Sequence, residues 1–322
     1  MAEKKGFKRL KPNDPLVKEL APGNYPWWDT LVERSHTDKK ISIQVRGNYL
    51  NVYSTMGNLL KVEMAGGKLV CKTHYKYLID DLADEYVVLR AESDHLAVKE
   101  PSCPLVTSLL EGKHLQRVQN NIAAHAGLEK TIQSKLVWHN RNTLLDAEIA
   151  FNEEGEQGDN TDRKTRIDLV NLDKRSNTVV FVELKQLSDV RLHSGEVNQQ
   201  ISKYIAFAQK QKENIIEAYR NVIEVKTLLG ILPKTWELAT AKIERVEPRP
   251  ILAIACSNQK YIDDWKRDLE KKLDTKQLAG LYFFGTNVDL NLKSDKNKEQ
   301  FLVDSVPVER EAENTACFPI AP

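Results

Sequence analysis

The sequence predicts a protein of the α/β class (mixed α+β), in which a central mixed sheet flanked by helices follows an antiparallel, β-rich N-terminal domain. Alternating apolar and polar residues, interrupted by glycines, occupy residues 41–78. Strand and helix patterns then alternate between residues 105 and 284. A hydrophobic fraction of 41% in 322 residues supplies enough material for one or two buried cores.

The N-terminal domain, residues 1–112, is expected to begin with an irregular lead-in over residues 1–40, which is rich in proline and lysine. Burial of Trp27 and Trp28 would anchor this lead-in. Residues 41–78 should then form a small antiparallel meander. Its expected turns are Gly47-Asn48, Gly57-Asn58 and Gly66-Gly67. The tyrosines of this meander either stack on bases or, as is commoner in a small sheet, fill its core; they are Tyr49, Tyr53, Tyr75 and Tyr77.

Paired prolines at 101–104 indicate the domain boundary, because proline interrupts both helices and sheet ladders. The second domain, residues 113–292, alternates between helix and strand, and a polar tail, residues 293–322, follows it. The expected elements are a helix over 105–135 broken near Gly112 and Gly127, strands at 144–151, 166–172 and 178–186, a long helix over 195–229, a strand at 251–256, a helix at 261–273 and a strand at 280–284. A polar loop at 152–164 separates the first two strands.

Composition excludes several classes of protein. The longest apolar run, in Ile251 to Ala255, is far shorter than the roughly 20 residues of a membrane span. No secretion signal follows the charged start, so we expect a cytoplasmic protein without a membrane partner. The four cysteines show no zinc-ligand spacing, and Gly-rich phosphate loops and a GxSxG elbow are absent. A formal net charge of +1 means that nucleic-acid binding would rest on local basic patches.

The segment that indicates chemistry runs from Thr165 to Gln186. If residues 173–177 form a tight turn, Asp168 lies approximately opposite Glu183 and close to Lys185. Strand alternation puts Glu183 and Lys185 on one face and Val180, Val182 and Leu184 on the other. Two carboxylates that repel each other in an apolar setting favour a divalent cation, and hard oxygen ligands suit Mg²⁺ or Mn²⁺.

This pattern, an aspartate at a strand end and then E-x-K on the next strand, resembles the PD-(D/E)XK nuclease superfamily. Asp168, Glu183 and Lys185 match its signature residues, and Ile167 replaces its leading proline. Glu129 lies on the preceding helix, where many members carry a further acid. Gln200 and Tyr204 match the Q-x-x-x-Y helix motif of RecB-type nucleases. The resemblance covers roughly residues 113–290 and implies a restriction-endonuclease-like core.

The resemblance also implies roles for these residues. Asp168, Glu183 and the backbone carbonyl of Leu184 would hold the metal, and Glu129 would order a water or a second ion. Lys185 would orient or deprotonate the attacking water and offset charge in the transition state. Gln200 and Tyr204 would position the backbone or the lysine beside the active site.

Structural alternatives stay open for each residue. The Asp168, Glu183 and Lys185 group could be a salt-bridge cluster on a solvated sheet face. Glu129 could be an exposed helix carboxylate, with Glu111 and Glu148 as weaker candidates for its role. Gln200 and Tyr204 could serve helix packing alone, and His193 is more often a surface histidine than a ligand.

The function expected from the resemblance is a Mg²⁺- or Mn²⁺-dependent endonuclease that hydrolyses DNA, in restriction or anti-phage defence. One alternative is a catalytically silent nucleic-acid-binding or assembly protein on the same fold. Another is a nuclease subunit that acts on RNA or branched substrates with a partner ATPase. Double-strand cleavage by a one-site chain favours a homodimer or larger homo-oligomer, and the N-terminal domain is a candidate surface for substrate or a protein partner.

Overall fold

The computed structural model describes residues 6–74, 77, 86–91, 96–98, 112–151, 165–256, 268–269 and 271–285. Within these ranges the chain divides into two compact units, and both are discontinuous in sequence. Unit 1 holds the described parts of Met1–Phe7, His139–Glu217 and Ala241–Pro322, and unit 2 holds those of Lys8–Trp138 and Ala218–Thr240. The domain boundary at residue 112, between two domains that are each continuous in sequence, stays a prediction.

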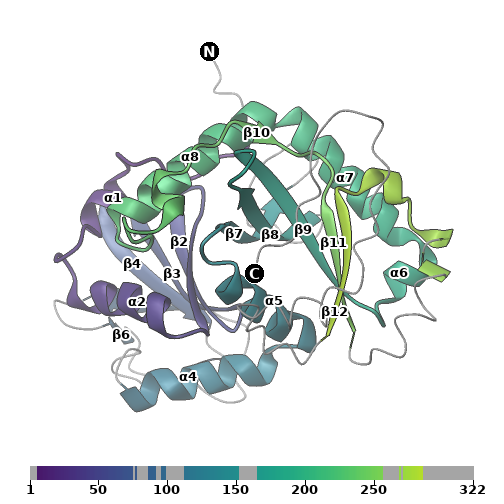
Figure 1. The fold of residues 1–322 in the computed structure, drawn as a ribbon. Helices are drawn as coiled ribbons and strands as arrows, with labels where there is room; N and C mark the ends of the chain where they lie inside the picture. The colour runs from purple at the N-terminus through teal and green to yellow at the C-terminus, as the bar shows by residue number, and fades with distance from the viewer. Residues whose placement is uncertain are drawn as a thin grey trace. The chain divides into compact units, whose positions relative to one another are not determined.

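Unit 2 contains an antiparallel meander that confirms the expected β-rich character (Figure 1). Its six strands follow one another in sequence order: β1 (Ile41–Val45), β2 (Tyr49–Ser54), β3 (Gly57–Ala65), β4 (Lys68–His74), β5 (Tyr86–Ala91) and β6 (Leu96–Val98). The last two strands extend the sheet beyond the predicted residues 41–78. Tyr53 is 7% exposed and hydrogen-bonded by Arg46 and Asn51, so it belongs to the interior.

The expectation of an irregular lead-in is wrong, because two helices, α1 (Pro15–Glu19) and α2 (Pro26–Thr37), occupy it. Each helix begins with its proline, and the first helical position tolerates proline because its missing N–H would have no partner within the helix. Asp14 caps α1 by accepting the Leu16 N–H at 2.9 Å. Burial of Trp27 and Trp28, at 2% and 0% exposure, is confirmed.

The expected helix over 105–135 appears as α4 (Gly112–His125) and α5 (Leu128–His139), with the break near Gly127. The expected helix over 195–229 is two helices, α7 (Glu196–Lys210) and α8 (Lys212–Leu228), and the short helix α6 (Val190–Ser194) precedes them. Gly195, with φ of +81°, separates α6 from α7, and Gln211 separates α7 from α8. Gln211 is buried, and its amide oxygen accepts the Phe7 N–H.

Unit 1 contains a mixed sheet, as predicted for the second domain. Its strands lie in the order β12-β11-β9-β8-β7. The strands are β7 (Leu144–Phe151), β8 (Thr165–Asp173), β9 (Thr178–Gln186), β11 (Ile251–Cys256) and β12 (Gly280–Gly285), with the two-residue β10 (Arg245–Val246) beside β9. β7, β8 and β9 pair antiparallel, whereas β9, β11 and β12 pair parallel. Short 3₁₀ helices span Glu237–Thr240 in unit 2 and Thr275–Gln277 in unit 1.

Helix α7 packs on the sheet face that carries Glu183 and Lys185 (Figure 1). Phe207 of this helix stacks on Phe151 with ring centroids 4.0 Å apart, and it also contacts Phe181. The opposite face of β9 is apolar and buried as predicted, since Val180, Val182 and Leu184 are at most 3% exposed.

Other expectations concern residues outside the described ranges: the segment 99–111 with its paired prolines, the loop 152–164, residues 261–267 of the expected helix, Tyr75, Glu111 and the tail 293–322.

Candidate active site

The β8–β9 hairpin brings Asp168 and Glu183 opposite each other. Leu169 pairs with Val182, and continuing that register by one residue sets Asp168 against Glu183. The side chain of Lys185, two residues further along β9, lies on the Glu183 face and contacts that carboxylate. The juxtaposition that the hairpin pattern predicted is therefore present.

The β8–β9 ladder ends at this point, and side chains of the cluster bind backbone groups beyond it. The Leu184 N–H donates to Asp168 Oδ2 at 2.7 Å. The carbonyl of Arg166, two residues before Asp168, lies within hydrogen-bond distance of the Tyr204 hydroxyl. Buried peptide groups need such partners, so the cluster also completes the hydrogen bonding of the sheet.

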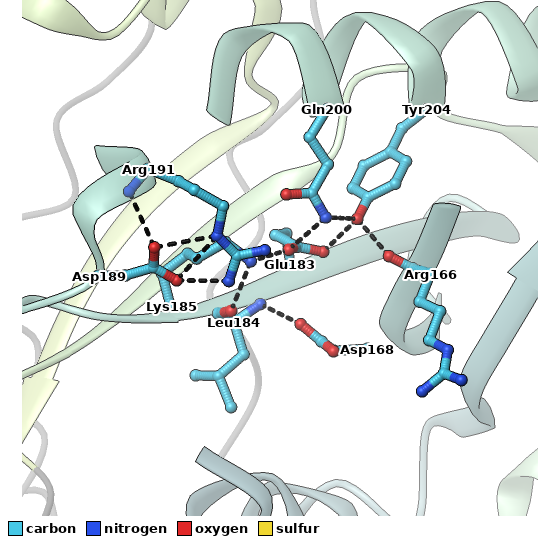
Figure 2. A network of polar contacts seen from close by, with 9 residues as sticks. All are labelled: Arg166, Asp168, Glu183, Leu184, Lys185, Asp189, Arg191, Gln200 and Tyr204. Atoms are coloured by element: carbon cyan, nitrogen blue, oxygen red, sulfur yellow. Dashed lines mark hydrogen bonds and ion pairs between the residues drawn. The ribbon is translucent and has the colours of Figure 1, made fainter. Parts of the chain in front are cut away.

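Glu183 lies at the centre of the network (Figure 2). Its Oε1 accepts from Lys185 Nζ and, at 2.7 Å, from Gln200 Nε2, while its Oε2 contacts the Tyr204 hydroxyl. Gln200 also donates to that hydroxyl. Because a phenol has one proton, Tyr204 can donate to Glu183 or to the Arg166 carbonyl at any moment, but not to both.

Burial rules out a solvated salt-bridge cluster. The side chains of Glu183 and Lys185 are each 2% exposed. Gln200 and Tyr204 do more than pack a helix, since both make polar contacts with Glu183. A buried ion pair of this kind is a weak contributor to stability, because the desolvation cost offsets the attraction.

The electrostatics of the cluster disfavour two ionised acids. Burial raises the pKa of Asp168 well above its usual range, and the neighbouring negative charge of Glu183 raises it further. Lys185 and the Leu184 N–H offset part of this effect. Burial and the Glu183 charge likewise raise the pKa of Tyr204 well above its ordinary value, so the phenol keeps its proton at neutral pH.

Glu148 is a further acid at this site, and the sequence argument ranked it below Glu129. In the β7–β8 register Ala147 pairs with Leu169 and Ile149 with Ile167, which sets Glu148 opposite Asp168. Its φ of +55° is unusual for a residue with a side chain. Its negative charge contributes to the raised pKa of Asp168. Strand alternation in LLDAEIAF was the signal that could have identified it.

The other predicted residues occupy different settings. Glu129 lies in the first turn of α5 in unit 2, whereas the cluster is built within unit 1, and its metal role stays a prediction. The Leu184 carbonyl accepts from Lys185 Nζ at 3.2 Å. His193 lies in α6, and its Nε2 is 2.8 Å from the carbonyl oxygen of Leu187 in the loop after β9.

The sequence argument missed the pair Asp189 and Arg191, which follows β9 directly. Asp189 caps α6 and binds the Arg191 guanidinium through both carboxylate oxygens. This pairing lowers the pKa of Asp189 against the opposing effect of burial, and the charge of Lys185 contributes to the lowering. Asp-x-Arg at a helix start was the available signal.

Comparison of the chain with protein-family models, with curated proteins and with solved structures finds no match. Among the described residues, no helix has the length and apolar character needed to cross a membrane.

The donor set at Asp168 suits a hard divalent cation. Carboxylate oxygens of Asp168 and Glu183 and the carbonyl of Leu184 are ligands that Mg²⁺ and Mn²⁺ prefer. In the described part of the chain no group of three or more His, Cys, Asp or Glu side chains is arranged to hold a metal ion. A cation here would therefore use two carboxylates and the Leu184 carbonyl, and would complete its shell with non-protein oxygens, as Mg²⁺ commonly does.

Proposed function

We propose that this chain is a metal-dependent endonuclease of the PD-(D/E)XK type, which hydrolyses phosphodiester bonds in DNA. The observation that carries the proposal is the buried juxtaposition of Asp168, Glu183 and Lys185, with Gln200 and Tyr204 bound to the central glutamate. Perturbed, converging ionisable groups of this kind are commoner at active sites than in structural cores.

The metal would be held by Asp168, Glu183 and the Leu184 carbonyl. When bound, it supplies Lewis-acid polarisation of the scissile phosphate and neutralises the repulsion between the two acids. This role agrees with the raised pKa of Asp168, because a nearby cation stabilises the ionised carboxylate.

Lys185 acts on the attacking water. Its ammonium is held in place by Glu183 and the Leu184 carbonyl, so it enters the reaction pre-positioned. From there it orients the water and offsets the negative charge that develops on the phosphate oxygens. Fixed charges in a water-excluded site act strongly because little solvent screens them.

Gln200 and Tyr204 are positioning residues. They hold both oxygens of Glu183 from α7, so the carboxylate presents a fixed orientation. Tyr204 also ties the helix to β8 through the Arg166 carbonyl. Pre-organised side chains of this kind reduce the reorganisation that the transition state would otherwise require.

The test is cleavage of supercoiled plasmid and labelled oligonucleotides with Mg²⁺ or Mn²⁺, with EDTA as the metal-free condition. We expect the wild type to cleave, and Asp168→Ala and Lys185→Ala to lose activity by about a hundredfold or more. The control is Asp268→Ala, which removes an acid whose side chain is 47% exposed. Equal cleavage by all four proteins would contradict the proposal.

Substrate class is decided in the same assay. Single-stranded, branched and RNA substrates are compared with duplex DNA under one set of conditions. Preference for RNA or junctions would point to a nuclease subunit with a different target. Binding without metal-stimulated cleavage would point to a catalytically silent protein on this fold.

A further inference from the structure

The side chain of Arg191 is held in a fixed position by Asp189. Its Nε donates to Asp189 Oδ1 at 3.0 Å, and its Nη2 donates to Oδ2 at 2.5 Å. The Arg191 backbone N–H also donates to Oδ1, so the same carboxylate fixes both ends of the residue. An arginine bound in this way loses little further freedom when it binds a ligand.

The pair lies next to the proposed catalytic cluster. Asp189 follows Lys185 by four residues, and its N–H donates to the Gln186 carbonyl at 2.9 Å, which closes a tight turn at the end of β9. The positive charge of Lys185 also acts on the Asp189 carboxylate. Figure 2 shows the Arg191 guanidinium against the Asp189 carboxylate.

Arg191 and Lys185 differ in their access to solvent. The Lys185 side chain is 2% exposed and is engaged by Glu183, whereas the Arg191 side chain is 43% exposed. A phosphate that approaches from solvent can therefore reach the guanidinium without breaking the buried ion pair. The two cations are suited to different phosphates, one at the reacting centre and one outside it.

We propose that Arg191 binds a non-reacting backbone phosphate of the nucleic-acid substrate, with Asp189 as the residue that positions its guanidinium. This inference rests on the proposed function, and it assigns part of the substrate binding by the nuclease to Arg191. A planar guanidinium matches two phosphate oxygens with parallel hydrogen bonds, which gives orientation as well as attraction. Contacts of this kind fix the register of a nucleic acid on a protein without reading its sequence.

The chain contains a matched control for this pair. Arg249 binds Glu247 two residues before it, with Nε to Oε1 at 2.9 Å, and its side chain is 29% exposed. The Glu247 N–H donates to the carbonyl of Val179, near the start of β9, whereas Lys185 lies near the end of that strand. Arg249→Ala therefore removes the same kind of surface pair at a distance from the site.

The experiment measures binding of short DNA duplexes by fluorescence anisotropy in an Asp168→Asn background with Mg²⁺, which under the proposed function does not cleave. One duplex is unmodified, and each of the others carries a single uncharged methylphosphonate at a different backbone position. We expect one such replacement to weaken binding about tenfold when Arg191 is present. Arg191→Ala should weaken binding of the unmodified duplex by a similar factor and abolish the effect of that replacement.

The remaining variants separate the outcomes. Arg249→Ala should behave like the Asp168→Asn parent, and Arg191→Lys should keep part of the affinity because it keeps the charge without the planar geometry. Thermal melting checks that each variant is folded. If Arg191→Ala binds every duplex as its parent does, or if no variant binds DNA, the Arg191 assignment is overturned. If the wild type fails to cleave while the methylphosphonate effect still depends on Arg191, the proposed function fails and the phosphate contact stands.

Discussion

At the scale of single residues, the cluster holds more negative charge than its lysine can balance. Asp168 and Glu183 oppose each other across the hairpin, Glu148 adds a third carboxylate nearby, and Lys185 pairs with Glu183. An ionised Asp168 therefore destabilises the metal-free fold. This cost is consistent with a site that is complete only when a cation is bound.

The first prediction is that Asp168→Asn stabilises the metal-free protein at neutral pH. The folded-state pKa of Asp168 is raised, so the fold binds that proton more tightly than the unfolded chain does. The contribution of Asp168 to the free energy of unfolding is thus most favourable in acid. It is lost as the pH rises from the pKa of this group in the unfolded chain through its pKa in the folded protein. We expect the variant to gain about 1–3 kcal/mol in free energy of unfolding at pH 7, because it removes a buried acid whose ionised form is disfavoured.

Urea denaturation in EDTA between pH 3.5 and 8 measures this gain, which should shrink toward zero at the acid end. Asp268→Asn, at an exposed site, should change stability by no more than about 0.5 kcal/mol at any pH. Adding Mg²⁺ should raise the melting temperature of the wild type more than that of the variant. A variant less stable than the wild type at pH 7 would contradict the prediction.

The second prediction concerns the Lys185 and Glu183 pair. Lys185→Met leaves a buried carboxylate without its counter-ion, and we expect a loss of about 3–5 kcal/mol in free energy of unfolding. Adding Glu183→Gln should restore much of this loss, because the uncompensated charge is gone. A double-mutant cycle by chemical denaturation measures the coupling.

Its control is Lys272→Met, which breaks an exposed pair with Asp268 and should cost no more than about 1 kcal/mol. If both lysine variants lose the same free energy of unfolding, burial of the Lys185 and Glu183 pair has no energetic consequence, which contradicts the prediction.

The central residues of the cluster were predictable because charged residues within an apolar strand pattern are visible in the sequence, and burying a lone charge is costly. The hairpin and strand alternation alone placed Asp168, Glu183 and Lys185 together. Strand alternation could have placed Glu148 on the face of Asp168, but the neighbouring register and the positive φ of Glu148 are not encoded by a local pattern. The Asp-x-Arg pattern at the start of α6 was a signal for the Asp189 and Arg191 pair, but a sequence does not say which way the Arg191 side chain turns.

At the scale of elements, strand patterns predicted the sheets better than proline counts predicted the helices. The predicted bounds of β7, β9 and β11 are the observed ones, because each strand is an alternating or continuous apolar run bordered by turn residues in the sequence. The proline and lysine content of residues 1–40 predicted an irregular lead-in, although Pro15 and Pro26 each begin a helix. The same residue therefore interrupts a helix or starts one, depending on its position.

The β2–β3 turn shows a similar limit. Gly57-Asn58 was the predicted turn, but Thr55 and Met56 form it with φ of +47° and +60°, and Gly57 begins β3. The structure supplies another reason for this glycine. A Cβ at position 57 would lie 2.3 Å from Ile122 Cγ2 of α4, so the residue is small because a helix packs on it.

The third prediction follows from that contact. Gly57→Ala should destabilise the protein by about 1–3 kcal/mol, the usual cost of overpacking a core. Ile122→Ala in the same protein should relieve the clash, so the double variant should lose less than the sum of the two single losses. Thermal or urea denaturation of the three proteins provides the test, and strict additivity would count against it.

At the scale of the whole molecule, the candidate site is confined to one of two units. All the residues of the cluster belong to unit 1, and α8 continues the chain from that unit into unit 2. The net charge of +1 supplies little long-range attraction for DNA. Under the proposed function, substrate binding would therefore rest on local groups such as Arg191, and affinity would be sensitive to single substitutions.

The last prediction uses the number of sites per chain. Under the proposed function, the one such cluster in the described part of the chain would cut one strand in one encounter, so a monomer would convert supercoiled plasmid to nicked circles before linear DNA appears. A homodimer presents two clusters and can cut both strands before it dissociates. We expect the ratio of linear to nicked product in early time points to rise with protein concentration over the range in which light scattering reports dimer formation. Linear product without nicked circles, from a protein that light scattering shows to be monomeric under the same conditions, would require a second site within the chain and contradict this account.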